Sequence, residues 1–325
     1  MATPSDPVVL IAAARGGDRR SLARLLTLVE ADGEAGRRVL ATLFSDTGRG
    51  WTVGLTGAPG AGKSTLTSGL IGRIRTEGSS VAVVAVDPSS PFSGGAILGD
   101  RVRMQDHTDD PGVYIRSLAT RGHLGGISEA TPRCLAVLDG IGFSEILVET
   151  VGVGQAEVDI AGNTDTTVVV VNPRWGDSIQ AAKAGLLEIG DVFVVNKADR
   201  PGVKETVRDL RQMLELGGAH GWQPPIVPTV AESGEGVADL WNAIAAHRRH
   251  LLENGELQAL RRARLVQEVR AEVINTVRRR VRGGIDDKTW HRIIDRVVAR
   301  EVDPWTAARE ITDMARPRRD GTLSV

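Results

Sequence analysis

Cysteine is almost absent from the sequence, which has only Cys134 among its 325 residues. A single cysteine cannot form an intrachain disulfide, and it cannot supply the clusters of thiolates that hold structural zinc. We therefore expect a protein of the reducing cytoplasm that has no cysteine-based metal site.

Aromatic residues and long apolar runs are scarce as well. Aromatic residues make up 3% of the chain, and no apolar run approaches the roughly 18 residues that a membrane-spanning helix requires. The N-terminal segment lacks the basic stretch that opens a signal peptide. Arginines are frequent in residues 247–325, but acidic residues are mixed with them and aromatic residues are not interleaved. The sequence therefore predicts neither a membrane protein nor a nucleic-acid-binding protein.

One glycine-rich stretch is the most informative part of the sequence. Residues 51–65 read WTVGLTGAPGAGKST, in which an apolar run typical of a buried strand precedes the pattern G-x-x-x-x-G-K-[ST]. Glycines let the backbone turn its N–H groups inward around a phosphate, the lysine adds positive charge, and the serine hydroxyl can bind Mg²⁺. The expected nucleotide-binding residues of this loop are Gly57, Ala58, Pro59, Gly60, Ala61, Gly62, Lys63, Ser64 and Thr65.

Short apolar runs alternate with helical stretches along much of the chain. Continuous apolar runs predict strands that are buried on both faces. Their alternation with helices predicts an α/β fold, a P-loop NTPase with a mainly parallel, doubly wound sheet and its ligand at the carboxyl ends of the strands. The predicted strands are 51–56, 81–86, 113–115, 145–149, 166–171, 192–195 and 226–230.

The tetrapeptide Asn196-Lys197-Ala198-Asp199 directly follows one of the predicted strands. An aspartate carboxylate there can accept hydrogen bonds from N1–H and the exocyclic amine of guanine, whereas adenine offers a lone pair and no amine, a difference of about 1–3 kcal/mol. Asn196 would hold the loop or the base edge, and the stem of Lys197 would cover the ring. Ala231 and Glu232 would lie on the other side of the base. The sequence therefore predicts GTP or GDP as the ligand.

Three acidic residues compete for Mg²⁺ and for the attacking water: Asp87, Asp100 and Glu149. Glu149 ends a predicted strand three residues before Gly152. In P-loop NTPases an acid at such a position lies near Mg²⁺, and the N–H of a glycine that follows it contacts the γ-phosphate. Asp87 is expected to orient water or to bind Mg²⁺ through its outer shell, Asp100 lies in a loop that could close over the metal, and Ser64 would be a further ligand. These residues predict hydrolysis of a phosphoanhydride, with the catalytic residues Lys63, Asp87, Glu149 and Gly152.

The patterns divide the chain into three parts. Residues 1–48 form an N-terminal helical segment, residues 49–249 form the P-loop GTPase domain, and residues 250–325 form a C-terminal helical arm. An exposed apolar stripe needs a partner, and a second copy of the chain is the simplest one, so we expect a homodimer. The stripe of the arm, at helical spacing, consists of Val266, Val269, Val273, Val277 and Val281.

Six motifs that occur in one order give the chain a resemblance to a known family. Together they resemble the methylmalonyl-CoA mutase-associated GTPases, the MeaB-type G-protein chaperones, which have also been described as ArgK-type transport ATPases. The resemblance extends over nearly the whole chain. Besides the P-loop, the motifs are DPSSPFSGGAILGDRVRM (87–104), ATRGHLGG (119–126), ETVGVGQAE (149–157), KAGLLEI (183–189) and NKAD (196–199).

This resemblance implies a GTPase of the SIMIBI class that is homodimeric through its C-terminal helices. Such a protein escorts the adenosylcobalamin-dependent mutase by gating cofactor loading and protecting the active enzyme. The switch regions of the family would fall on 87–104, 149–157 and 172–183, and the last would relay the nucleotide state to the mutase. The candidate relay residues are Asp177, Gln180 and Lys183.

The sequence departs from its relatives at two places. Ala58 stands where many SIMIBI ATPases carry a second, signature lysine, so activation in trans by that lysine is not expected. Arg174 and Trp175 put a bulky pair in the third switch, where small residues are expected.

Two other functions are weighed against the mutase chaperone. A metallochaperone GTPase of the nickel-insertion kind would need a cluster of cysteine and histidine residues, and the chain has one cysteine and six scattered histidines. An ATP-dependent kinase linked to amino-acid transport is disfavoured by the guanine motif.

Overall fold

The computed structural model describes residues 6–87, 104, 106–119, 130–150, 156–173, 185, 187–216 and 221–315. The chain forms two compact units, Met1–Leu260 and Arg261–Val325.

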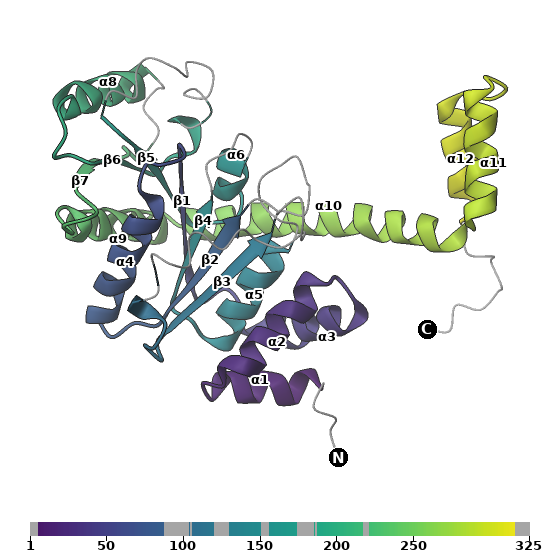
Figure 1. Ribbon diagram of the computed structural model, residues 1–325, viewed down its shortest axis with the longest axis horizontal. Helices are drawn as coiled ribbons and strands as arrows, with labels where there is room; N and C mark the ends of the chain where they lie inside the picture. The colour runs from purple at the N-terminus through teal and green to yellow at the C-terminus, as the bar shows by residue number, and fades with distance from the viewer. Residues whose placement is uncertain are drawn as a thin grey trace. The chain divides into compact units, whose positions relative to one another are not determined.

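The first unit is built on one parallel sheet, as the sequence predicts (Figure 1). The order of its seven described strands is β3-β2-β4-β1-β5-β6-β7, so β1, which leads into the glycine-rich loop, lies in the middle. All neighbouring strands pair in parallel, and their carboxyl ends therefore meet at one edge. The strands are β1 (Trp51–Gly57), β2 (Val81–Asp87), β3 (Val113–Ala119), β4 (Glu145–Thr150), β5 (Thr166–Val171), β6 (Val192–Asn196) and β7 (Ile226–Thr229).

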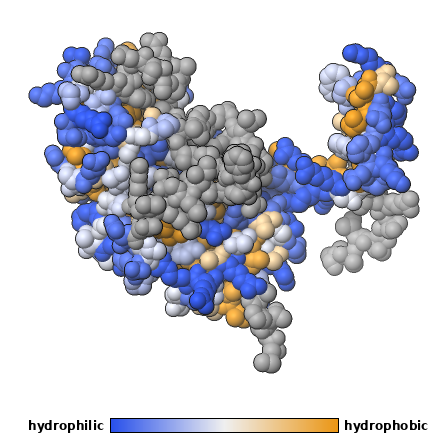
Figure 2. All heavy atoms as spheres, in the orientation of Figure 1, coloured by the Kyte–Doolittle hydropathy of each residue, from blue (hydrophilic) through white to orange (hydrophobic). Residues whose placement is uncertain are grey.

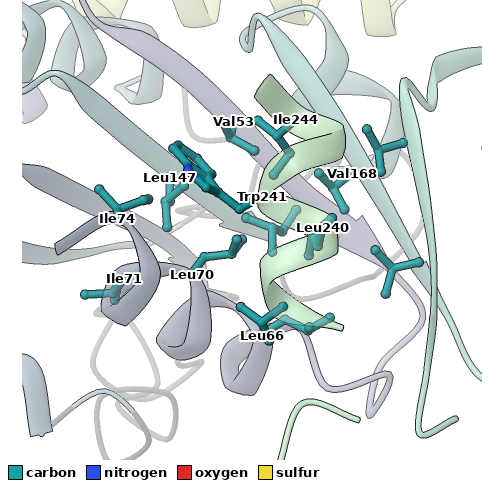
Figure 3. Packing of buried hydrophobic residues seen from close by; sticks show 14 of the residues in the cluster. Val53, Leu66, Leu70, Ile71, Ile74, Leu147, Val168, Leu240, Trp241 and Ile244 are labelled. Carbon is teal, nitrogen blue, oxygen red and sulfur yellow. The ribbon is translucent and has the colours of Figure 1, made fainter. Parts of the chain in front are cut away.

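One face of the sheet is covered by α4 (Lys63–Thr76) and α9 (Val237–Glu253). Figure 3 shows side chains of both helices meeting those of the strands, with Leu70 of α4 and Leu240 of α9 among them. Both leucines are fully buried. This packing holds the start of α4, where the phosphate loop ends, against the central strands.

The other face is covered by α5 (Thr131–Ile141), α6 (Ala156–Ala161) and α8 (Val203–Leu216). Alternate residues of each strand point to the two faces, so the strands read as continuous apolar runs. In β5, Val168 and Val170 pack toward α4 and α9, whereas Val169 and Val171 pack with residues of α8. Burial on both faces explains why these strands could be recognised from the sequence.

Three N-terminal helices pack against α5. They are α1 (Pro7–Arg15), α2 (Arg19–Glu30) and α3 (Glu34–Leu43), followed by the short 3₁₀ helix η1 (Phe44–Asp46). Asp6 and Asp18 accept hydrogen bonds from backbone N–H groups in the first turns of α1 and α2, which is the usual role of an aspartate N-cap. Gly17 has a φ of 91° between the two helices, a conformation that glycine adopts readily.

Strand β3 is longer than the sequence predicts. The apolar run stops at Ile115, but the strand continues to Ala119 in register with β2. The polar residues Arg116 and Ser117 hide this extension in the sequence. The Arg116 guanidinium donates to Glu30 of α2 at 2.8 Å, so a contact from a distant helix accommodates the charge within the sheet.

The second unit contains most of α10 (Glu256–Gly284), together with α11 (Asp287–Val298) and α12 (Pro304–Met314). Its small core joins Ile293 of α11 to Ala307 and Ile311 of α12. Figure 2 shows apolar residues reaching the surface of this helix pair, in agreement with the exposure of Val298. Among the described helices, none is both long enough and apolar enough to cross a membrane.

An ion pair with a buried carboxylate lies at the amino-terminal edge of the sheet, away from the carboxyl ends of the strands. Glu145, the first residue of β4, accepts a hydrogen bond of 2.9 Å from Arg248 of α9. Arg248 in turn lies over the ring of Trp51, 5.0 Å from its centroid. Burial raises the pKa of Glu145 to about 7, and the attraction of Arg248 opposes this shift only in part.

Replacing Glu145 should change how stability depends on pH. The folded-state pKa of about 7 exceeds the ordinary value of 4.5, so between these values the folded protein binds more protons than the unfolded chain, and the free energy of unfolding falls as pH rises. We expect Glu145→Gln to show a smaller fall between pH 5 and 7.5 than the wild type in urea titrations. Glu253→Gln, at an exposed position of α9, is the matched control and should follow the wild type. Parallel curves for all three proteins would contradict the raised pKa of Glu145.

Candidate nucleotide-binding site

The glycine-rich loop joins the end of β1 to the start of α4. Gly57, Gly60 and Gly62 have φ values of 130°, 73° and 95°, which residues with side chains rarely adopt. A Cβ atom on Gly57 would lie 2.0 Å from the carbonyl oxygen of Val170. On Gly62 it would lie 2.2 Å from Nδ2 of Asn196. The loop therefore needs glycine both for its turns and for the close approach of β5 and β6. Its other residues are Ala58, half-buried, Pro59, exposed, and Ala61, buried; Thr65 is half-buried in the first turn of α4.

The ammonium group of Lys63 lies inside this loop. Nζ donates to the carbonyl oxygens of Gly57 at 2.7 Å and Ala58 at 3.1 Å, and the residue is only 6% exposed. A buried positive charge surrounded by backbone groups is complementary to a phosphate, since an anion would offset the cost of burying the ammonium. The first turn of α4 adds the positive end of its helix dipole.

Ser64 and Glu149 form a pair of oxygen donors beside the loop. The Ser64 hydroxyl donates to Oε1 of Glu149 at 2.5 Å, and the two residues are 6% and 4% exposed. The pairing of β1 with β4 sets Glu149 opposite Leu55, two residues before the loop begins. A hydroxyl and a carboxylate are hard oxygen ligands of the kind that Mg²⁺ prefers. The residues present thus fit Mg²⁺ next to a phosphate.

The remaining acidic candidates are described only in part. Asp87 is the last residue of β2, and β2 pairs with β4 up to Thr150, so its backbone lies at the same edge as Glu149. Asp100 and Gly152, together with the relay candidates Asp177, Gln180 and Lys183, lie outside the described residues.

Asn196 connects three loops at the carboxyl edge. Its Nδ2 donates to the carbonyl oxygen of Ala61 at 2.7 Å. Its Oδ1 accepts from Oγ1 of Thr229 at 3.0 Å and from the backbone N–H of Ala231 at 3.1 Å. The side chain is almost fully buried. Asn196 thus ties the glycine-rich loop to the loops that follow β6 and β7.

The neighbouring residues lie around this connection. Lys197 has a φ of 61°, and its Nζ donates to the carbonyl oxygen of Gly60 at 2.7 Å. Ala198 donates its N–H to the carbonyl oxygen of Thr229 at 2.9 Å. Asp199 and Glu232 are exposed, so both carboxylates can reach a ligand from solvent. The roles of these residues in base recognition remain predictions.

Thr229 is a member of the network that the sequence analysis missed. It is the last residue of β7 and is fully buried, and it contributes both a hydroxyl and a carbonyl to the loop after β6. Its position in the sequence could have identified it, because this threonine ends an apolar strand at the same edge as the other polar residues. The assembled edge can hold a phosphate, a divalent cation and a planar base side by side.

Comparison with known proteins places the chain in a family. The family model described as methylmalonyl Co-A mutase-associated GTPase MeaB matches residues 22–286. A putative GTPase of Pyrococcus abyssi is 48% identical over 303 residues, which are 92% of this chain and 94% of the relative. The mitochondrial methylmalonic aciduria type A homolog of Mus musculus is 35% identical over 75% of this chain and 64% of the relative.

A solved structure agrees with this placement. The crystal structure of an LAO/AO transport system kinase superposes with a TM-score of 0.69 at 26% identity, and the match covers 96% of this chain and 98% of that one. The family match includes the glycine-rich loop, Glu149 and the Asn196–Asp199 segment. The chain therefore belongs to the family of methylmalonyl Co-A mutase-associated GTPases MeaB.

Proposed function

We propose that this GTPase binds GTP with Mg²⁺ and hydrolyses it to GDP and phosphate at the carboxyl edge of the sheet. The observation that carries the proposal is the Asn196 side chain, which joins the phosphate loop at Ala61 to the loop bearing Asp199. A nucleotide bound there would meet Lys63 with its phosphates and Asp199 with its base. Ser64 and Glu149 would hold Mg²⁺, which neutralises charge on the phosphates.

The proposed roles of the chain's own residues follow from their positions. Lys63 would exchange its two carbonyl partners for phosphate oxygens, and the loop N–H groups would orient the phosphates for attack. Glu149 would hold Mg²⁺, either directly or through water. Asp87, at the end of the adjacent strand, would orient the attacking water. Lys197 would cover one face of the base with its stem, and Ala231 would offer its N–H near the edge of the base.

The guanine preference is tested by Asp199→Asn. An amide cannot accept hydrogen bonds from both N1–H and the exocyclic amine, so we expect GTP affinity to fall about 10- to 100-fold. Xanthine carries an oxygen in place of that amine, so the variant should bind XTP better than the wild type does. The measurement is a fluorescence competition titration with GTP, XTP and ATP. Asp209→Asn, at an exposed position of α8, is the control. Equal affinity of the wild type for ATP and GTP would contradict the assignment.

We further propose that the protein acts as a G-protein chaperone of adenosylcobalamin-dependent methylmalonyl-CoA mutase, gating cofactor loading and protecting the loaded enzyme. Support comes from the family description, which names the mutase, and from the similarity to the mouse protein named for methylmalonic aciduria. The proposed relay residues are Asp177, Gln180 and Lys183. The chain has a single cysteine and so cannot form an intrachain disulfide, which fits the reducing cytoplasm where we place the protein.

The mutase proposal predicts that the two proteins affect each other. We expect the rate of GTP hydrolysis to change when purified mutase is added, because a partner that distinguishes nucleotide states shifts their equilibrium by a typical 1–3 kcal/mol. Lys183→Ala should keep the rate without mutase and lose most of the response. Lys204→Ala, an exposed lysine of α8, should keep both. A wild-type rate that ignores the mutase would argue against the chaperone function, and an intact response in Lys183→Ala would remove that residue from the relay.

We also propose a homodimer formed through the arm, residues 250–325. Helix α10 has no buried residues, and Val269 and Val273 are 64% and 58% exposed on one side of it. Val266 and Val277 continue the same stripe and are exposed as well. Apolar stripes of this kind on a long helix are usually covered by another helix.

Charges placed on this stripe should therefore yield monomers. We expect Val269→Glu combined with Val273→Glu to halve the mass measured by light scattering, because two buried carboxylates would have to lose their water. Ala271→Glu adds a charge to an exposed position well away from the stripe on α10 and should leave the mass unchanged. A stripe variant with the wild-type mass would place the subunit interface elsewhere.

A further inference from the structure

The side chain of Lys197 joins the phosphate loop to the loop after β6. Lys197 follows β6, and Gly60 belongs to the loop after β1, whereas the sheet order places β5 between β1 and β6. Neighbouring strands are about 4.8 Å apart. The hydrogen bond from Lys197 Nζ to Gly60, 2.7 Å long, therefore connects the loops that follow β1 and β6, the two strands on either side of β5.

Asn172 is the residue that stands at this end of β5. The ladder between β5 and β6 pairs Val170 with Val194 and Val171 with Val195, so Asn172 comes next to Asn196. Continuing the alternation of Val168 and Val170, it lies on the face covered by α4 and α9. On that same face and at the same level, Asn196 reaches Ala61.

The side chain of Asn172 has an unusual feature for such a position. Its Oδ1 atom is enclosed by protein and has no hydrogen-bond partner among the residues that the structure describes. Buried polar atoms nearly always have partners, and one without a partner costs free energy. Because this acceptor lies next to the phosphate loop, we expect a donor to reach it when a ligand binds.

We propose that Asn172 is a positioning residue for guanine nucleotides and that its Oδ1 accepts a hydrogen bond from the Lys197 ammonium in the nucleotide-bound protein. An ammonium has three N–H donors, and the carbonyl of Gly60 accepts one. With Asn172 Oδ1 as a second acceptor, the ammonium holds the lysine stem extended, so that the stem covers the base. The inference rests on the proposed GTP binding and adds a residue that acts on the ligand through Lys197.

The position of the acceptor distinguishes this role from contact with phosphate. An amide that touched a phosphate would have to donate from Nδ2, and replacing it by a carboxylate would bring two negative charges together. An amide that accepts from Lys197 can be replaced by a carboxylate without loss, because a charged acceptor forms a stronger hydrogen bond with an ammonium. Asn172→Asp therefore gives opposite results in the two cases.

The experiment compares Asn172→Ala, Asn172→Asp, Lys197→Ala and the double variant Asn172→Ala/Lys197→Ala in the full-length protein. The probes are fluorescent GDP and a fluorescent non-hydrolysable GTP analogue, and thermal unfolding without nucleotide is recorded in parallel. Asn163→Ala is the control, since Asn163 is a half-buried asparagine before the amino-terminal end of β5, at the edge of the sheet opposite to Asn172.

We expect Asn172→Ala to weaken GDP and GTP binding by the same factor, about 5- to 10-fold, with a thermal midpoint no lower than that of the wild type. Asn172→Asp should bind within about 3-fold of the wild type. The double variant should bind about as weakly as Lys197→Ala alone, because both substitutions remove one interaction.

Three results would overturn the inference alone while leaving GTP binding intact: unchanged affinity in Asn172→Ala, additive losses in the double variant, or a larger loss in Asn172→Asp than in Asn172→Ala. The last result, if greater for GTP than for GDP, would assign Asn172 to the phosphates instead. A wild-type protein that binds neither guanine nucleotide would overturn the proposed function together with this inference.

Discussion

The hydrogen bonds of Asn196 are the interaction on which the rest of the candidate site depends. One amide side chain holds Ala61 of the phosphate loop, the hydroxyl of Thr229 and the N–H of Ala231. Since the side chain is buried, its loss would leave several groups without partners, each at a cost of about 1–3 kcal/mol. Gly62 has to be glycine partly because a Cβ there would occupy the place of the amide nitrogen. The phosphate side and the base side of the site are thus built as one unit.

The parallel sheet makes this arrangement possible. Because all the paired strands run in the same direction, every loop that follows a strand starts at the same edge. Helices α4 and α9 bury their apolar sides against the central strands. This packing fixes the position of the first turn of α4 relative to the carboxyl edge of the sheet. The carboxyl edge therefore brings the first turn of α4, with Lys63 and Ser64, to Glu149 of β4, which accepts a hydrogen bond from Ser64.

The two edges of the sheet hold different sets of polar groups. At the amino-terminal edge, Glu145 is paired with Arg248, which lies on Trp51. At the carboxyl edge, the Lys63 ammonium donates to the carbonyl oxygens of Gly57 and Ala58, and the Ser64 hydroxyl donates to Glu149. The carboxyl edge therefore brings a cation, a hydroxyl and a carboxylate together at the glycine-rich loop, a set of groups that suits a phosphate with a divalent cation.

The sequence by itself determined the α/β fold, the phosphate loop and the family. The strands are buried on both faces and so read as apolar runs, and the glycine pattern reflects backbone geometry that no other residue allows. It could not show that β3 continues through Arg116, because that charge is accommodated by Glu30 from a separate helix. Nor could it show that Asn196 has three partners or that Asn172, at the end of β5, comes next to Asn196 of β6, since these relations depend on the order β1-β5-β6. The sequence determines local structure through neighbouring residues, whereas the contacts between loops that follow different strands depend on the order in which the strands pair.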